Sequence, residues 1–181
     1  MNLPNKLTIG RIVLIPVFMF FLLVNVTYGK YFAAVIFIVA AATDGLDGYI
    51  ARKRKQITNF GKIMDPLADK LLVTAALISL VQLGEINAWV AFIILAREFT
   101  ITGLRSVVAA EGVVVAASPL GKIKTVTQIV AISLILLKDF YTPYIAFPLA
   151  DATLYVALFF TIWSGVDYVV KINKKFKIDD I

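Results

Sequence analysis

Apolar residues run through most of the chain in long blocks, separated by short polar segments. Two blocks, residues 12–26 and 152–166, are long enough with their flanking residues to cross a hydrocarbon core, which needs about 20 helical residues. The other apolar blocks reach that length only by including neighbouring charged residues: 31–43, 71–83, 86–96 and 126–137. The charges so included must face protein or water. The pattern predicts an all-α integral membrane protein.

The blocks predict six transmembrane helices, at residues 8–27, 31–52, 64–83, 86–110, 120–138 and 148–171. Connections between successive helices then alternate sides, and one side receives nearly all Lys and Arg: Lys6, Arg11, Arg52, Lys53, Arg54, Lys55, Lys62, Lys122, Lys124, Lys171, Lys174, Lys175 and Lys177. The opposite side receives Lys30 and Lys138. Because basic residues favour the cytoplasmic side, both termini are predicted to be cytoplasmic.

The N-terminus has a basic residue followed by an apolar run, as a signal peptide does. No Ala-x-Ala-like cleavage site follows, so we expect an uncleaved first helix. Residues 1–8 resemble a short interfacial segment, in which Pro4 stops the helix from extending backwards. No linker, repeat or low-complexity tract divides residues 1–181, so we expect a single membrane domain in the cell membrane.

The amino-acid composition limits the kinds of catalytic and metal sites that the protein can form. The chain is 60% hydrophobic with a mean hydropathy of +0.88, and it contains no cysteine and no histidine. Disulfides, thiol nucleophiles, Cys/His zinc sites and imidazole acid or base catalysis are thereby excluded. The net charge of +6 favours contact with anionic lipid headgroups rather than nucleic acid, because the basic residues flank membrane spans.

Four aspartates lie in the otherwise apolar middle of the chain. Asp44 and Asp47 are three residues apart and Asp65 and Asp69 four apart, so each pair occupies one face of its own predicted helix. The short link at residues 53–63 makes the two helices antiparallel neighbours, and all four carboxylates can converge near their cytoplasmic ends. Four such carboxylates would repel one another unless hard divalent cations neutralised them. With only oxygen ligands, Mg²⁺ or Mn²⁺ is favoured over zinc.

Small residues accompany the aspartates. Gly45, Gly48 and Ala51 lie near the first pair, and Gly61 precedes the second pair by four residues. A helix face without bulky side chains lets a ligand approach the backbone, although small residues also serve helix packing. Arg52 carries planar donors that suit phosphate oxygens. Cations, an arginine and a clear backbone surface together indicate a pyrophosphate site.

This pattern resembles a known signature. Its spacing, Dx2DGx2ARx8Gx3Dx3D, is similar to that of the CDP-alcohol phosphatidyltransferases, and all eight positions match: Asp44, Asp47, Gly48, Ala51, Arg52, Gly61, Asp65 and Asp69. The resemblance implies a six-helix membrane enzyme, usually a homodimer, that transfers the phosphatidyl group of CDP-diacylglycerol to an alcohol and releases CMP. It also implies two divalent ions, held by the first three aspartates, with the fourth contributing or acting as a base.

We expect Asp44, Asp47 and Asp65 to be the principal metal ligands. Asp69 is expected to bind the second ion and to take the proton from the attacking hydroxyl, since no histidine competes for that role.

The nucleotide is expected to lie against Gly48, Ala51 and Gly61, with Arg52 on a phosphate. Asn5 and Thr8 resemble polar residues that the family places beside the nucleotide; ordinary helix capping is the alternative for them.

The acceptor alcohol is suggested by basic residues in and near the later helices. The stretches REFTITGLR and ASPLGKIKT resemble the members of the family that use glycerol 3-phosphate, and a cationic cluster would suit an acceptor that carries a phosphate. The candidates for that phosphate are Lys62, Arg97, Arg105, Lys122 and Lys124. For the lysines, contact with lipid headgroups is the alternative. Glu98 can pair with an arginine, and Asp167 has no assigned role.

Two other functions stay open. The same transfer could use another acceptor, such as inositol phosphate, serine or a phosphatidyl lipid. A cation transporter could also line its path with aspartates, although transport does not require a pyrophosphate site.

Overall fold

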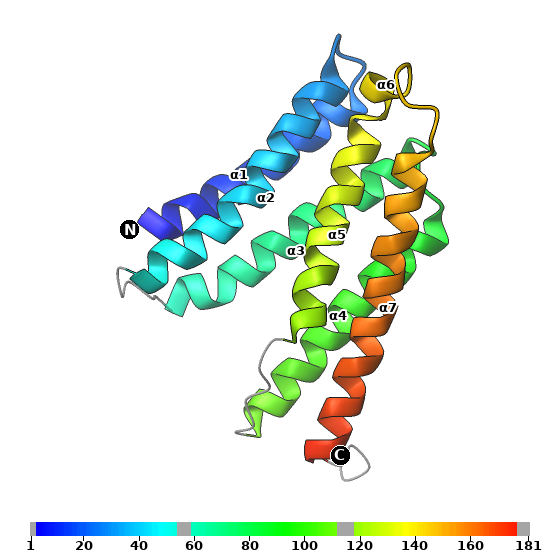
Figure 1. Cartoon of the computed structure of the whole chain (residues 1–181). Helices are drawn as coiled ribbons and strands as arrows, with labels where there is room; N and C mark the ends of the chain where they lie inside the picture. Colours follow the sequence, from blue (N-terminus) through cyan, green and yellow to red (C-terminus); the bar gives the residue numbers. More distant parts are fainter. Residues whose placement is uncertain (1–2, 54–58, 112–117, 177–181) are drawn as a thin grey trace. The chain divides into compact units, whose positions relative to one another are not determined.

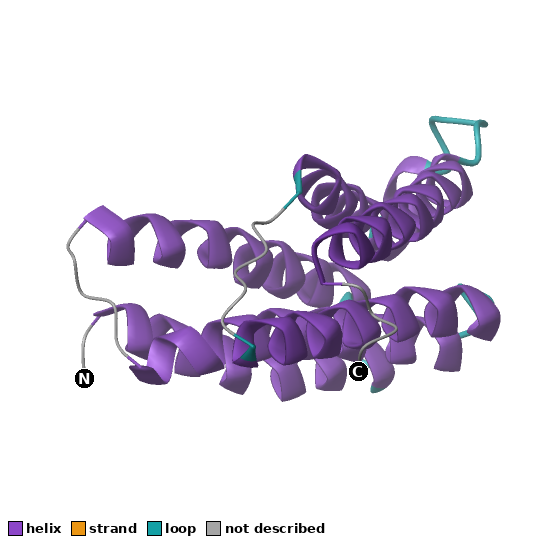
Figure 2. Cartoon of the chain, turned by 90° about the horizontal axis from the view of Figure 1, so that it is seen from below, coloured by secondary structure: helices purple, strands orange, loops and turns teal. Residues whose placement is uncertain are grey.

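The computed structural model describes the backbone of residues 3–53, 59–111 and 118–176 and the side chains of residues 5–43, 61, 64–111 and 118–173. Every regular element in these ranges is helical, which confirms the all-α prediction (Figures 1 and 2). The elements are α1 (Leu3–Leu23), α2 (Gly29–Lys53), α3 (Asn59–Gln82), α4 (Ala88–Ala110), α5 (Pro119–Leu136), α6 (Lys138–Tyr141) and α7 (Leu149–Phe176).

The long helices, all but the short α6, each overlap one predicted segment. Three contain stretches long and apolar enough to cross a membrane: Asn5–Leu23, Pro119–Leu136 and Leu149–Asn173. A shorter apolar helix, Gly29–Thr43, lies within α2. The chain is therefore a membrane protein by helix length and composition, and the six-span topology stays a prediction.

The N-terminal segment differs from the prediction. Helix α1 begins at Leu3, so residues 3–8 form its first turns and are not a separate segment ahead of it. Pro4 is tolerated because the first turn of a helix has no internal acceptor for its N–H groups, which makes a proline there harmless. It therefore lies just inside the helix start.

The chain folds as two compact units. The first unit comprises Met1–Ile86 and Ile132–Phe147, and the second comprises Asn87–Ala131 and Pro148–Ile181, so that α5 contributes to both.

In the first unit, α1 packs against α2 and α3, and α2 also contacts α3 (Figure 1). Phe18 and Phe37 are fully buried, with ring centroids 5.9 Å apart. The turn between α1 and α2 requires Gly29, where a Cβ would run into the carbonyl oxygen of Phe21.

A charged cluster ties three elements of this unit together. Lys30, at the start of α2, contacts Glu85 after α3 at 3.2 Å and Asp139 of α6 at 3.0 Å. Lys138 contacts Glu85 at 3.6 Å. Lys30 and Lys138, which the predicted topology places on the non-cytoplasmic side, thus share Glu85 as a partner, and that topology stays a prediction.

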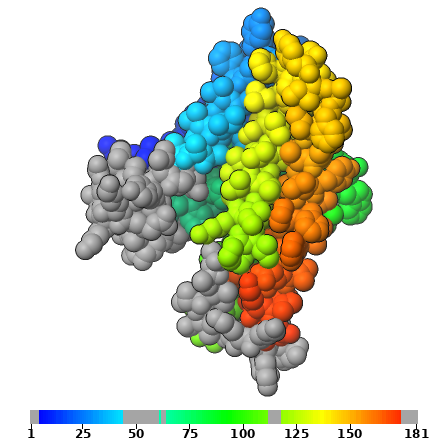
Figure 3. All heavy atoms as spheres, viewed as in Figure 1, coloured from blue at the N-terminus to red at the C-terminus, as the bar shows by residue number. Residues whose placement is uncertain are grey.

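In the second unit, α4 packs against α7. Their shared core contains Ile101 and Val108 of α4 with Tyr168 and Ile172 of α7. Several large apolar side chains of α7 are exposed, among them Tyr155, Phe159, Trp163 and Val166, and atoms of this helix are visible in orange in Figure 3. An apolar exposed surface of this kind suits contact with lipid.

Candidate active site

The aspartate pairs lie on two helices of the first unit. Asp44 and Asp47 belong to α2, and Asp65 and Asp69 belong to α3, and the two helices are in contact. The side chains of Asp44 and Asp47 lie outside the described residues, as do those of Gly45, Gly48, Ala51 and Arg52. Among the described side chains, no group of three or more His, Cys, Asp or Glu could hold a metal ion, so the four-aspartate site stays a prediction.

The half of the predicted site on α3 is described. Asp65 and Asp69 are both partly buried, and Gly61, four residues before Asp65, is buried. A spacing of four residues places all three on one face of α3. That face offers carboxylate oxygens, the donors that hard divalent ions prefer, beside a residue without a side chain. The described residues therefore fit a divalent ion and a closely approaching ligand.

Thr8 of α1 orients one of these carboxylates. Its hydroxyl donates a hydrogen bond of 2.5 Å to Oδ1 of Asp65, across 57 residues of sequence, and Thr8 is fully buried. A hydrogen bond to an ionised acceptor is short and strong, and it restricts the direction in which the carboxylate points. Thr8, expected beside the nucleotide, thus also contacts a candidate metal ligand.

The buried face of α1 is polar. Asn5, Thr8 and Arg11 recur every three residues and are 9%, 0% and 2% exposed, whereas Val13 and Phe20 of the same helix are more than half exposed. This arrangement inverts that of a water-soluble helix, because lipid takes the apolar side. The sequence predicts Arg11 only as a charge that flanks the first span. Its three-residue spacing from Thr8 was the signal that would have placed it on this buried face.

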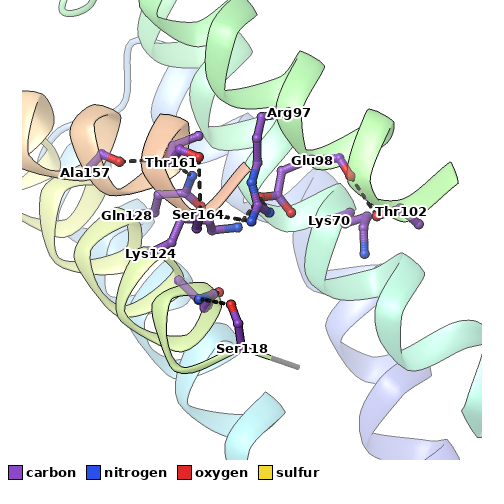
Figure 4. Close-up of polar contacts among 12 residues, drawn as sticks. Lys70, Arg97, Glu98, Thr102, Ser118, Lys124, Gln128, Ala157, Thr161 and Ser164 are labelled. Carbon is purple, nitrogen blue, oxygen red and sulfur yellow. Dashed lines mark hydrogen bonds and ion pairs between the residues drawn. The ribbon is translucent and has the colours of Figure 1, made fainter. Parts of the chain in front are cut away.

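A second polar cluster lies in the second unit, where α4, α5 and α7 meet (Figure 4). Arg97 of α4 donates from Nη1 to Oε1 of Glu98 at 3.3 Å and from Nη2 to Oγ of Ser164 at 2.9 Å. Lys124 of α5 donates to the same Oε1 of Glu98. The side chains of Arg97, Glu98 and Lys124 are 14%, 15% and 6% exposed.

The five residues predicted to bind the acceptor phosphate therefore differ in their burial and contacts. Arg97 and Lys124, 27 residues apart, come together on one carboxylate. Arg105 and Lys122 are exposed and do not join that carboxylate in the described contacts. The side chain of Lys62 lies outside the described residues.

Several residues of this cluster were not among the predicted site residues. Ser164 and Thr161 of α7 are fully buried, and Gln128 of α5 donates to the Thr161 hydroxyl at 2.9 Å. Buried hydroxyl and amide groups on apolar helices are a signal for such contacts, but the sequence does not say which partners meet. Asp167, which had no assigned role, pairs with Lys171 at 2.7 Å on α7 itself.

The sequence profile for CDP-alcohol phosphatidyltransferase matches residues 1–163. The chain belongs to the CDP-alcohol phosphatidyltransferase family. This confirms the family suggested by the spacing of the aspartates, glycines and arginine.

Relatives in the family align with nearly the whole chain. The sequence is 50% identical to a CDP-diacylglycerol–glycerol-3-phosphate 3-phosphatidyltransferase of Bacillus subtilis, over 94% of each chain. It is 40% identical to the protein of the same name in Rickettsia bellii over 97% of each chain. For the Haemophilus influenzae protein of that name, identity is 38% over 99% of this chain and 97% of the relative.

The hydrogen bond between Thr8 and Asp65 provides a first test. We expect Thr8→Val, which keeps the shape but removes the donor, to lower kcat/KM for phosphatidyl transfer about 10-fold or more. The basis is that a hydrogen bond to a charged group contributes about 1.5–3 kcal/mol. Thr8→Ser keeps the hydroxyl and should retain most activity. Initial rates of CMP release measure the effect, and equal rates for the valine and serine variants would contradict it.

Proposed function

We propose that this protein transfers the phosphatidyl group of CDP-diacylglycerol to glycerol 3-phosphate, giving phosphatidylglycerophosphate and CMP in phospholipid synthesis. The observation that carries the proposal is the identity of 38–50% to proteins with that enzymatic name over nearly their full lengths. The cationic pair Arg97 and Lys124 supports a phosphate-bearing acceptor, because it would repel a choline or ethanolamine head group.

We propose that two divalent ions, Mg²⁺ or Mn²⁺, are held by Asp44, Asp47, Asp65 and Asp69. Bound there, the ions would polarise the phosphate oxygens and offset the charge that develops on the departing CMP. Thr8 would keep Oδ1 of Asp65 in a fixed direction as a ligand.

The chain's own groups would then bind and orient the substrates. Arg52 would hold a phosphate of the nucleotide, while Gly48, Ala51 and Gly61 leave space along the helices for cytidine and Asn5 adds a polar contact. The attacking hydroxyl of glycerol 3-phosphate forms a bond to the lipid-bearing phosphorus as the bond from that phosphorus to the CMP oxygen breaks. Asp69 would accept the hydroxyl proton, and a carboxylate within hydrogen-bond reach is suited to that step.

The acceptor's own phosphate would bind Arg97 and Lys124, with Arg105, Lys122 and Lys62 as further cationic candidates. Arginine presents a planar set of donors to phosphate and lysine a compact charge. The pairing of Arg97 with Lys124 through Glu98 favours these two over the exposed Arg105 and Lys122.

In this proposal the whole chain acts as one catalytic membrane domain with six spans. Both termini and the active site face the cytoplasm, as the distribution of Lys and Arg indicates. The enzyme acts as a homodimer, a property implied by the family resemblance.

The test is CMP release by purified protein supplied with CDP-diacylglycerol, glycerol 3-phosphate and Mg²⁺. We expect CMP and phosphatidylglycerophosphate in equal amounts, with activity lost on chelation by EDTA and restored by added Mg²⁺ or Mn²⁺. Parallel reactions with inositol phosphate, serine and phosphatidylglycerol examine the other acceptors. A faster reaction with one of these, or CMP release without any acceptor, would contradict the proposal.

A further inference from the structure

The carboxylate of Glu98 lies between two cations. Oε1 accepts hydrogen bonds both from Nη1 of Arg97 and from Nζ of Lys124, so one oxygen atom fixes the separation of a guanidinium on α4 and an ammonium on α5. Like charges held this close would otherwise repel each other. Glu98 therefore offsets the repulsion between the two cations.

The cluster is largely buried. The side chains of Arg97, Glu98 and Lys124 are at most 15% exposed. Burial of charged groups is unfavourable unless they are paired. In addition, Nε of Arg97 is buried and makes no hydrogen bond within the part of the chain that the structure describes. A buried donor on a cation, beside a second cation, suits an anion with several acceptor oxygens.

Helix α7 determines the direction of the guanidinium. Ser164 accepts from Nη2 of Arg97 and donates its own hydroxyl proton to the carbonyl of Thr161 at 3.1 Å, so that its oxygen is turned towards the arginine (Figure 4). At the next residue, Gly165, a Cβ would lie 3.2 Å from Cγ and 3.7 Å from Nε of Arg97. A Cβ at this position would therefore require the Arg97 side chain to shift by a few tenths of an ångström.

The helix that carries Lys124, α5, is tied to α7 by buried hydrogen bonds. One turn further along this helix, Gln128 is 3% exposed and donates to the hydroxyl of Thr161, which in turn donates to the carbonyl of Ala157 at 2.6 Å. This chain of buried hydrogen bonds ties α5 to α7. Arg97 thus contacts Ser164 of α7 directly, and the helix that carries Lys124 is tied to the same segment of α7 through Gln128.

We infer that Glu98 and Gly165 are positioning residues that hold Arg97 and Lys124 as a preformed pair for the acceptor phosphate. Ser164 completes the arrangement by turning the guanidinium. The inference rests on the proposed function and deepens it. The preference for a phosphorylated acceptor would depend on Glu98 and Gly165, which need not touch the acceptor themselves. If these residues served only as polar contacts between membrane helices, their substitution would change the KM values for both substrates to the same extent or not at all.

The first test replaces Glu98 by glutamine, with Glu111→Gln on the exposed end of the same helix as the matched control. We expect Glu98→Gln to raise KM for glycerol 3-phosphate, and the inhibition constant of inorganic phosphate competing with it, about 10-fold, while KM for CDP-diacylglycerol changes less than about twofold. Glu98→Asp, which keeps the charge, should recover part of the loss. Equal changes for both substrates, or none, would overturn the inference.

The second test replaces Gly165 by alanine and compares it with Gly103→Ala on α4, where a Cβ meets nothing within 4 Å. We expect Gly165→Ala to displace Arg97 and to raise KM for glycerol 3-phosphate about 10-fold, with the Gly103 variant unaffected. This test remains decisive if Glu98→Gln fails to fold. Identical kinetics in the two alanine variants would overturn the inference alone, whereas wild-type protein that cannot use glycerol 3-phosphate would overturn the proposed function with it.

Discussion

Asp69→Asn is expected to lower kcat for phosphatidyl transfer by about 10²- to 10⁴-fold, the range that a positioned general base contributes. Asparagine has the same shape as aspartate but cannot accept the proton of the attacking hydroxyl. Asp69 is partly buried on the face of α3 that also carries Asp65, so the substitution changes charge and basicity without a large change in packing. CMP release at saturating concentrations of both substrates measures the effect.

Two roles are proposed for Asp69, and titration of the divalent ion separates them. If Asp69 acts as the base, the loss in kcat persists at saturating Mg²⁺. A ligand role alone would be compensated by higher Mg²⁺, which restores turnover. Asp151→Asn is the matched control, because Asp151 is exposed in the first turn of α7 and should leave the rate unchanged. Near-normal turnover of Asp69→Asn with metal bound would show the base assignment to be wrong.

Arg97→Gln is expected to raise KM for glycerol 3-phosphate by about 10- to 150-fold, with a much smaller effect on KM for CDP-diacylglycerol. Hydrogen bonds to charged groups contribute about 1.5–3 kcal/mol, which corresponds to that range of affinity. The glutamine side chain keeps an amide donor but removes the charge, and Glu98 is then left with Lys124 as its cationic partner. Initial rates at varied concentrations of each substrate separate the two constants.

Arg97→Lys tests whether charge is sufficient. Lysine keeps the positive charge but lacks the planar set of donors, so we expect only partial recovery of the affinity for glycerol 3-phosphate. The matched control is Lys171→Gln, which removes an exposed cation of α7 that pairs with Asp167. An increase in KM as large in Lys171→Gln as in Arg97→Gln would indicate that general surface charge, rather than the Arg97 cluster, attracts the acceptor.

The sequence alone determined the helices and the family. Each long helix contains an apolar block of the sequence, which in four of the six predicted segments had to be extended over neighbouring charged residues, and the length needed to cross a bilayer is a property of the local chain. The motif from Asp44 to Asp69 is likewise local, since fixed spacings of three and four residues place side chains on one face of a helix without reference to the rest of the protein. The N-terminal boundary was misplaced because a proline within the first turn does not end a helix.

Only the tertiary structure decided which distant polar groups meet. Thr8 reaches Asp65 across 57 residues, Lys124 reaches Glu98 across 26, and Arg97 reaches Ser164 across 67. In an apolar chain every helix has suitable faces for packing, so the pattern of hydrophobic residues does not select one set of neighbours. Burial distinguishes Arg97 and Lys124 from Arg105 and Lys122, whereas residue type does not, because each pair consists of one arginine and one lysine. Burial depends on how the helices pack against one another.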